Sequence, residues 1–72
     1  MNTITLIIIP GAGARSLNLN NDTTVADLVT LQSLHGRDII INGTGIAPNN
    51  FATTTIPNNA EVFATGSVKG NG

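Results

Sequence analysis

The sequence predicts an α+β fold, a mixed sheet of four to five strands with one helix packed on one of its faces. Near both ends of the chain, apolar and polar residues alternate with the period of two that is typical of strands. Between these ends, residues 25–34 carry apolar side chains at helical spacing. Glycine-containing turn dipeptides separate the segments. The 72 residues contain no internal repeat, so a single domain is expected.

The first predicted strand is the segment NTITLIIIP, which is β-branched or aliphatic almost throughout. One of its faces carries Ile4, Leu6 and Ile8. The opposite face is polar at its start but apolar at its end, where it carries Ile7 and Ile9. A strand with apolar residues on both faces is expected near the centre of a sheet.

A hairpin is predicted next, because the turn cluster PGAG leads into the alternating segment ARSLNLN. Leu17 and Leu19 point inward in this pattern, and Ser16 and Asn18 point outward. Glycine-rich turns can also present N–H groups to a phosphate. Here no Lys-Ser/Thr pair follows and the segment continues as a strand, which favours the hairpin turn.

One helix is predicted from a capping-box pattern, in which Thr24 is followed three residues later by Asp27. Gly36 is expected to end the helix in a left-handed conformation. The residues expected on its inner side are Val25, Leu28, Val29, Leu31 and Leu34. Among these, Leu28, Val29 and Leu31 are expected to face Leu17, Ile41 and Val62.

The rest of the chain predicts a short buried strand, a turn at Asn42-Gly43, a brief edge strand at residues 46–47 and a last strand. An irregular connection held by Phe51 and Ile56 precedes the last strand, EVFATGSV. Its Val62 and Ala64 share one face, with Phe63 on the other. The first and last strands are the most apolar, so they are expected side by side at the centre, with the helix over the inner face. This is the β-grasp (ubiquitin-like) arrangement, predicted for residues 1–68 with a flexible tail at 69–72.

Composition excludes several classes of function. The chain has no cysteine and one histidine, His35, so a metal site is not expected. Its three cations are scattered and its formal net charge is −1, which argues against nucleic-acid binding. No apolar run could span a membrane and no signal peptide is evident, so a cytoplasmic protein, alone or within an assembly made there, is expected. No nucleophile, base and orienting group are predicted to meet, so no catalytic residue, cofactor or enzymatic activity is expected.

The segment INGTGIAPNNFATTTIPNNAEVF resembles the ubiquitin-like sulfur carriers of the ThiS/MoaD-like family. The resemblance covers residues 23–66 and rests on Ile41-Asn42, Ile46, Pro48, Phe51-Ala52, Ile56 and Val62. It implies a carrier whose C-terminal glycine, here Gly72, is adenylated by an E1-like partner that supplies ATP, and then becomes a thiocarboxylate. The family ends in two glycines, whereas this sequence has Asn71 before Gly72.

Two functional hypotheses follow. The preferred one is a non-catalytic interaction module that docks onto a protein partner or a larger assembly, for example as a structural or decoration accessory. It would use the outer sheet face around Ile7, Ile9, Arg15 and Phe63, or an exposed strand edge. The low content of charged residues, 10%, and Asn71 favour it. The alternative is the sulfur carrier that works through Gly72.

Overall fold

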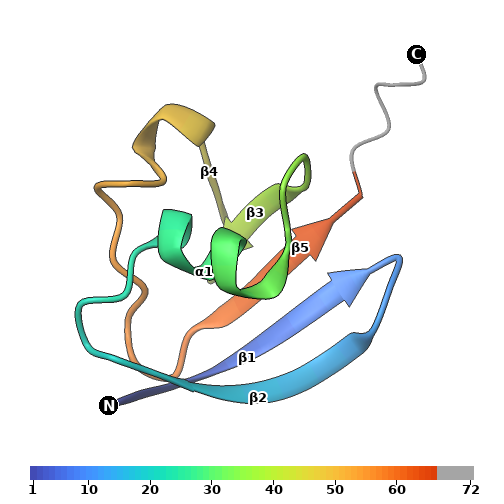
Figure 1. Ribbon diagram of the computed structural model, residues 1–72. Coiled ribbons are helices and arrows are strands. Elements are labelled where there is room, and N and C mark those ends of the chain that lie inside the picture. The colour runs from blue at the N-terminus through green and yellow to red at the C-terminus, as the bar shows by residue number, and fades with distance from the viewer. Residues whose placement is uncertain (67–72) are drawn as a thin grey trace.

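A computed structural model describes residues 1–66 of the chain, so the predicted domain end at residue 68, the tail at 69–72 and Gly72 lie outside the described residues. Within residues 1–66 the fold is α+β, with a five-stranded sheet, one α-helix and one short 3₁₀-helix (Figure 1). The elements, in chain order, are β1 (Asn2–Ile9), β2 (Gly13–Leu19), α1 (Val25–Gln32), β3 (Asp38–Ile41), β4 (Thr44–Ile46), η1 (Pro48–Asn50) and β5 (Glu61–Thr65).

The strands are arranged in the order β2-β1-β5-β3-β4, and β1 pairs in parallel with β5 while the other neighbours are antiparallel. The predicted hairpin of β1 and β2 is confirmed, as is the central position of the first and last strands. The antiparallel neighbours in chain order, β1 with β2 and β3 with β4, need only short turns. The parallel pair joins the first and last strands of the described residues, which requires the intervening segments to cross over the sheet.

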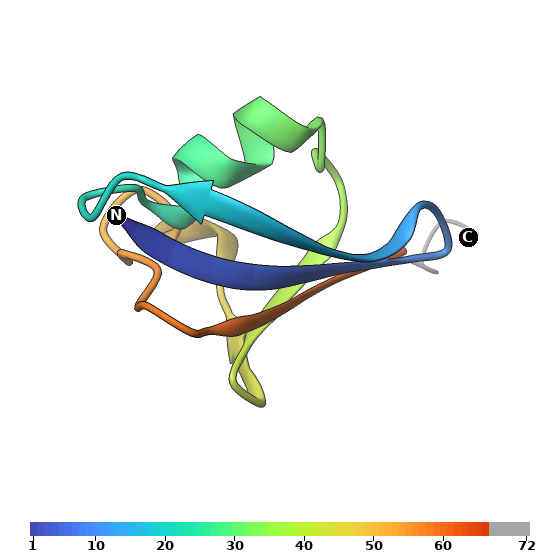
Figure 2. The same cartoon turned by 90° about the horizontal axis from the view of Figure 1, so that it is seen from below.

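The helix covers one face of the sheet and leaves the other free of helices in the described part of the chain (Figure 2). The core lies between α1 and the covered face, where the inward residues of β1 and β5 meet the helix. The alternation predicted for both strands is confirmed, because their inward side chains are buried. The buried apolar residues are Ile4, Leu6, Ile8, Leu19, Val25, Leu28, Val29, Leu34, Ile39, Ile41, Ile56, Ala60, Val62 and Ala64. Leu17, expected to point inward, packs against this core while remaining partly exposed.

The start of the helix follows the capping-box prediction. The Oγ1 atom of Thr24 accepts a hydrogen bond from the backbone N–H of Asp27, and the Asp27 carboxylate accepts one from the N–H of Thr24. The backbone N–H groups of Val25 and Ala26 donate to carbonyls of Thr54 and Phe51, in the long connection before β5. Side-chain caps and this connection therefore satisfy N–H groups that no helical turn can reach.

The predicted end of the helix is wrong in two respects. The chain leaves α1 at Ser33, which is left-handed with φ 58°, three residues before the expected Gly36. Leu31, expected to face the core, is 66% exposed, because only the narrow stripe of Val25, Leu28 and Val29 meets the sheet. Leu34 is buried as expected, but it reaches the core from the turn after the helix.

The predicted turn between β3 and β4 is confirmed, and Asn42 has a second role there. Asn42 and Gly43 both have positive φ, 50° and 87°, as a type I′ hairpin turn requires. The backbone N–H of Asn42 donates to the carbonyl of Glu61 at 2.9 Å, and its side-chain Oδ1 accepts from the N–H of Glu61 at 2.9 Å. One residue therefore forms the turn and also fastens the start of β5 to β3.

Candidate interaction surface

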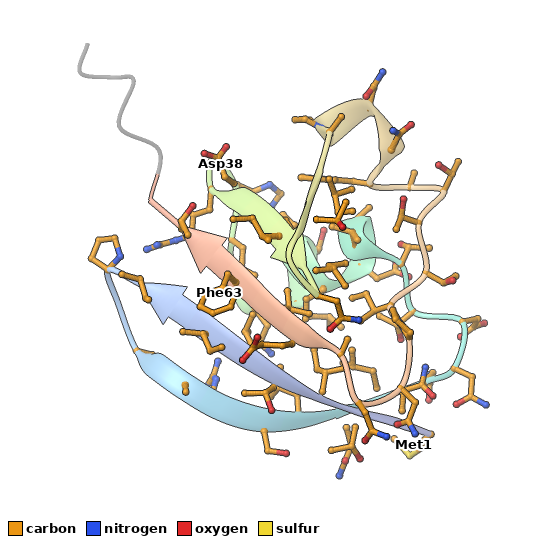
Figure 3. The ribbon with its side chains drawn as sticks, turned by 180° about the vertical axis from the view of Figure 1, so that it is seen from behind. Met1, Asp38 and Phe63 are labelled. Carbon is orange, nitrogen blue, oxygen red and sulfur yellow. The ribbon has the colours of Figure 1, made fainter. Side chains whose placement is uncertain are left out.

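The most distinctive surface of the described chain is the sheet face opposite to α1, which we call the open face. Its centre is a row of three apolar residues from adjacent strands, Ile7 of β1, Phe63 of β5 and Ile40 of β3. Ile7 is in register with Phe63, and Phe63 with Ile40, so their side chains stand next to one another on one face. Figure 3 views the sheet from this side and shows Phe63 near its middle. All three side chains are half-buried, with Ile9 more exposed at the end of β1.

Strand alternation determines which side chains lie on this face. Leu6 and Ile8 are buried beneath the helix, so Ile7 between them must point to the other side. Val62 and Ala64 are buried in the same way, which directs Phe63 outward. The residues of the open face are therefore the direct neighbours of the core residues, and the same strands position both sets.

Small residues continue the apolar row at its two ends, and acidic residues lie on either side of it along the strands. Ala14 of β2 is in register with Ile7, and Gly45 of β4 with Ile40, so neither edge strand raises a large side chain beside the row. Two charged residues of the strands, Asp38 and Glu61, have side chains on this face and both are exposed. They lie on opposite sides of the row, about 13 Å apart along the strands, because four residue steps separate Thr65, the partner of Asp38, from Glu61.

Arg15 does not belong to this surface, and its grouping with Ile7, Ile9 and Phe63 is corrected. It is in register with buried Leu6, so its side chain lies on the helix side of the sheet. There its guanidinium donates a hydrogen bond to the side chain of Gln32 at the end of α1. The alternation of β2 already predicts this placement, since Arg15 lies on the same face of the strand as Leu17 and Leu19.

The open face also contains a residue that the sequence hypothesis omitted, Ile40. The signal was present in the three consecutive isoleucines of β3. Ile39 and Ile41 are buried, so the residue between them must occupy the opposite face. A run of three apolar residues in a short strand indicates apolar contact on both faces.

Other kinds of site find little support in residues 1–66. This part of the chain has no group of three or more His, Cys, Asp or Glu residues that could hold a metal, and no pocket. His35 is exposed, and the predicted hairpin turn rather than a phosphate loop follows β1. The Nη1 atom of Arg37 is buried without a hydrogen-bond partner in this range. No helix in the described range has the length and apolar character needed to cross a bilayer.

Searches of the chain against protein-family models, curated proteins and solved structures find no match.

Proposed function

We propose that this chain is a β-grasp interaction module without catalytic activity of its own, which docks onto a larger protein assembly through the open face. One observation carries the proposal: Ile7, Phe63 and Ile40 form an in-register apolar row on a sheet face that no described element covers. The order of the strands, with parallel β1 and β5 at the centre and one helix on one face, supports the β-grasp assignment.

The composition of the open face matches that of the centre of a protein interface. Interface cores are enriched in aromatic residues and depleted in charged ones, and a few central side chains supply most of the binding energy. Phe63 has that central position here, and the acidic residues lie outside the row. Covering the exposed parts of these side chains stabilises a complex by roughly 25 cal/mol for each Å² of apolar surface removed from water.

The charges of the open face support a partner with a basic rim. Asp38 and Glu61 are both exposed, on opposite sides of the apolar row. The matching partner surface therefore has an apolar centre with lysine or arginine residues on two sides. Such rim charges contribute to the rate of association and to the choice of partner more than to affinity.

Site-specific photo-crosslinking in cells that make the protein tests the proposal. A photoreactive phenylalanine analogue replaces Phe63 in one variant and Thr30, which is exposed on the helix, in a matched control. We expect a discrete crosslinked protein with the probe at position 63 and little at position 30. An equal yield at the two positions, or none at 63, would overturn the proposal. In the position-63 variant, Glu61→Lys should lower the yield, because it reverses a rim charge.

A sulfur carrier remains the second candidate, supported by the resemblance of residues 23–66 and by the position of β5 beside β1. It predicts that incubation with an E1-like enzyme, ATP and a sulfur donor exchanges one terminal oxygen for sulfur at Gly72. Intact-mass spectrometry detects this exchange. Deletion of residues 70–72 separates the two candidates, because it abolishes the exchange but leaves crosslinking through position 63 intact.

A further inference from the structure

The direction of the backbone hydrogen bonds in β1 determines which groups of β2 are free. In a strand, the N–H and C=O of one residue point to the same side, and successive residues alternate. The N–H of Thr5 donates to Ala60, and the carbonyls of Thr3 and Ile9 accept from Asn59 and Gly66. The odd-numbered residues of β1 therefore face β5, and the even-numbered ones face β2.

The register then assigns each residue of β2 to one side. Ile4 is opposite Leu17 and Leu6 is opposite Arg15, so the odd-numbered residues of β2 bond to β1. The backbone groups of Ala14, Ser16 and Asn18 point away from the sheet. No hydrogen bond within residues 1–66 reaches these groups, and no element lies beside this edge (Figures 1 and 3).

The opposite edge of the sheet, formed by β4, has fewer backbone groups free to pair with a further strand. The N–H of Asn42 donates to Glu61, so the even-numbered residues of β3 face β5 and the odd-numbered ones face β4. Ile39 and Ile41 thus bond to Ile46 and Thr44, which leaves Gly45 as the one residue of β4 with outward backbone groups. The strand ends at Ile46, and the 3₁₀-helix η1 begins at Pro48, so this edge continues no further. The β2 edge is therefore the place where a further strand can add to this sheet.

We infer that the β2 edge pairs with β2 of a second copy of this chain, antiparallel and about a two-fold axis at Ser16. Ser16 then lies opposite Ser16 of the second copy, and Ala14 lies opposite Asn18. Each of these pairs exchanges two backbone hydrogen bonds. On the helix side, Leu17, which is half-buried, lies opposite the aliphatic stem of the second copy's Arg15.

A second copy fits this edge because the features that usually prevent self-pairing are missing. Exposed edge strands are normally protected by proline, by lysine and other charges, or by a bulge. β2 contains no proline, lysine or acidic residue, and its register with β1 is continuous. Its one charged side chain, Arg15, is directed to Gln32 of the helix. The formal net charge of −1 adds little repulsion between copies.

Two-fold pairing at this edge joins two five-stranded sheets into one. Directly opposed residues of an antiparallel pair lie on the same face, so both helices lie on one side of the joined sheet and both open faces on the other. The pairing is independent of the proposed function, since it uses a different surface. If both hold, the dimer presents two docking surfaces to one assembly and binds it with avidity.

Single cysteines test the pairing and its register, because the chain has no cysteine of its own. Residues in a hydrogen-bonded pair have Cα atoms about 5.5 Å apart, within the roughly 4.4–6.8 Å that a disulfide needs. Ser16→Cys should therefore give a disulfide-linked dimer under mild oxidation. Asn18→Cys, equally exposed, should not, because the two introduced thiols would lie more than about 13 Å apart. Combining Ala14→Cys with Asn18→Cys should restore the crosslink.

Equilibrium sedimentation of the cysteine-free protein gives the second measurement. We expect a reversible dimer, and we expect Ser16→Pro to weaken it at least about tenfold, because it removes the outward N–H at the two-fold axis. The ladder with β1 does not use this N–H, so the circular dichroism spectrum should be unchanged. Ser16→Lys, which opposes two ammonium groups, should act similarly if the proline variant unfolds. A monomer at all concentrations, or crosslinking of Asn18→Cys alone, would overturn the inference.

Discussion

Ser33 shows how a single residue sets the end of an element. A non-glycine residue in the left-handed region is about 1–2 kcal/mol less stable than in the right-handed one. Ser33 adopts φ 58°, and the next residue, Leu34, is thereby turned into the core, where it is 2% exposed. The backbone N–H groups of Ser33 and Leu34 both donate to the carbonyl of Val29, which closes the last turn of α1.

We therefore predict that Ser33→Gly stabilises the fold, by about 1 kcal/mol, because glycine adopts positive φ without a steric penalty. Chemical denaturation monitored by circular dichroism measures the change. The matched control is Thr30→Gly, in the exposed middle of the helix, which should lower the free energy of unfolding by about 0.5–1 kcal/mol. A loss of stability in both variants would contradict the assigned helix end.

Leu28 and Leu31 are one turn apart in sequence but differ completely in environment. Leu28 is fully buried, whereas Leu31 is 66% exposed. We predict that Leu28→Ala lowers the free energy of unfolding by about 2–5 kcal/mol. Leu31→Ala should change it by less than about 0.5 kcal/mol, since it removes few contacts. Thermal or urea denaturation compares the two, and equal losses would place Leu31 in the core as the sequence pattern suggested.

At the scale of elements, the turn between β3 and β4 also fastens β5, because Asn42 both donates to and accepts from Glu61. We predict that Asn42→Gly, which keeps access to positive φ, loses about 1 kcal/mol with the side-chain hydrogen bond. Asn42→Ala should lose more, because alanine also tolerates φ 50° poorly. Asn49→Ala, at an exposed position of η1, serves as the neutral control. If Asn42→Ala proved no worse than Asn42→Gly in urea denaturation, the turn would not depend on its left-handed residue.

The strands illustrate how far an element can be predicted on its own. β1 and β5 alternate clearly, and their inward residues were predicted correctly. β3 consists of one aspartate and three isoleucines, so its pattern does not distinguish inside from outside. The register with β5 makes the distinction, because Ile40 is opposite Phe63 and Ile41 is opposite Val62. The open face was therefore predicted in part, with Ile7, Ile9 and Phe63, but without Ile40.

At the scale of the whole molecule, the parallel contact between β1 and β5 joins the two ends of the described chain. Leu6 and Val62 are in register there and both are 0% exposed. We predict that Leu6→Ala and Val62→Ala are coupled by about 0.5–3 kcal/mol in a double-mutant cycle of unfolding free energies. Leu6→Ala and Ile46→Ala should be additive, because three strand spacings, about 14 Å, separate β1 from β4. Additivity of the Leu6 and Val62 pair would contradict the sheet order.

Local sequence patterns were sufficient to predict the α+β class, the hairpin, the capped start of the helix, the Asn42-Gly43 turn and the inward faces of β1 and β5. These features follow from local physics, namely side-chain periodicity, capping and turn chemistry, which nearby residues specify. The end of the helix at Ser33, the exposure of Leu31 and the position of Ile40 depended on the packing of distant segments. Each depends on which partner from a distant segment covers a given side, and the residues flanking that position do not encode the identity of that partner.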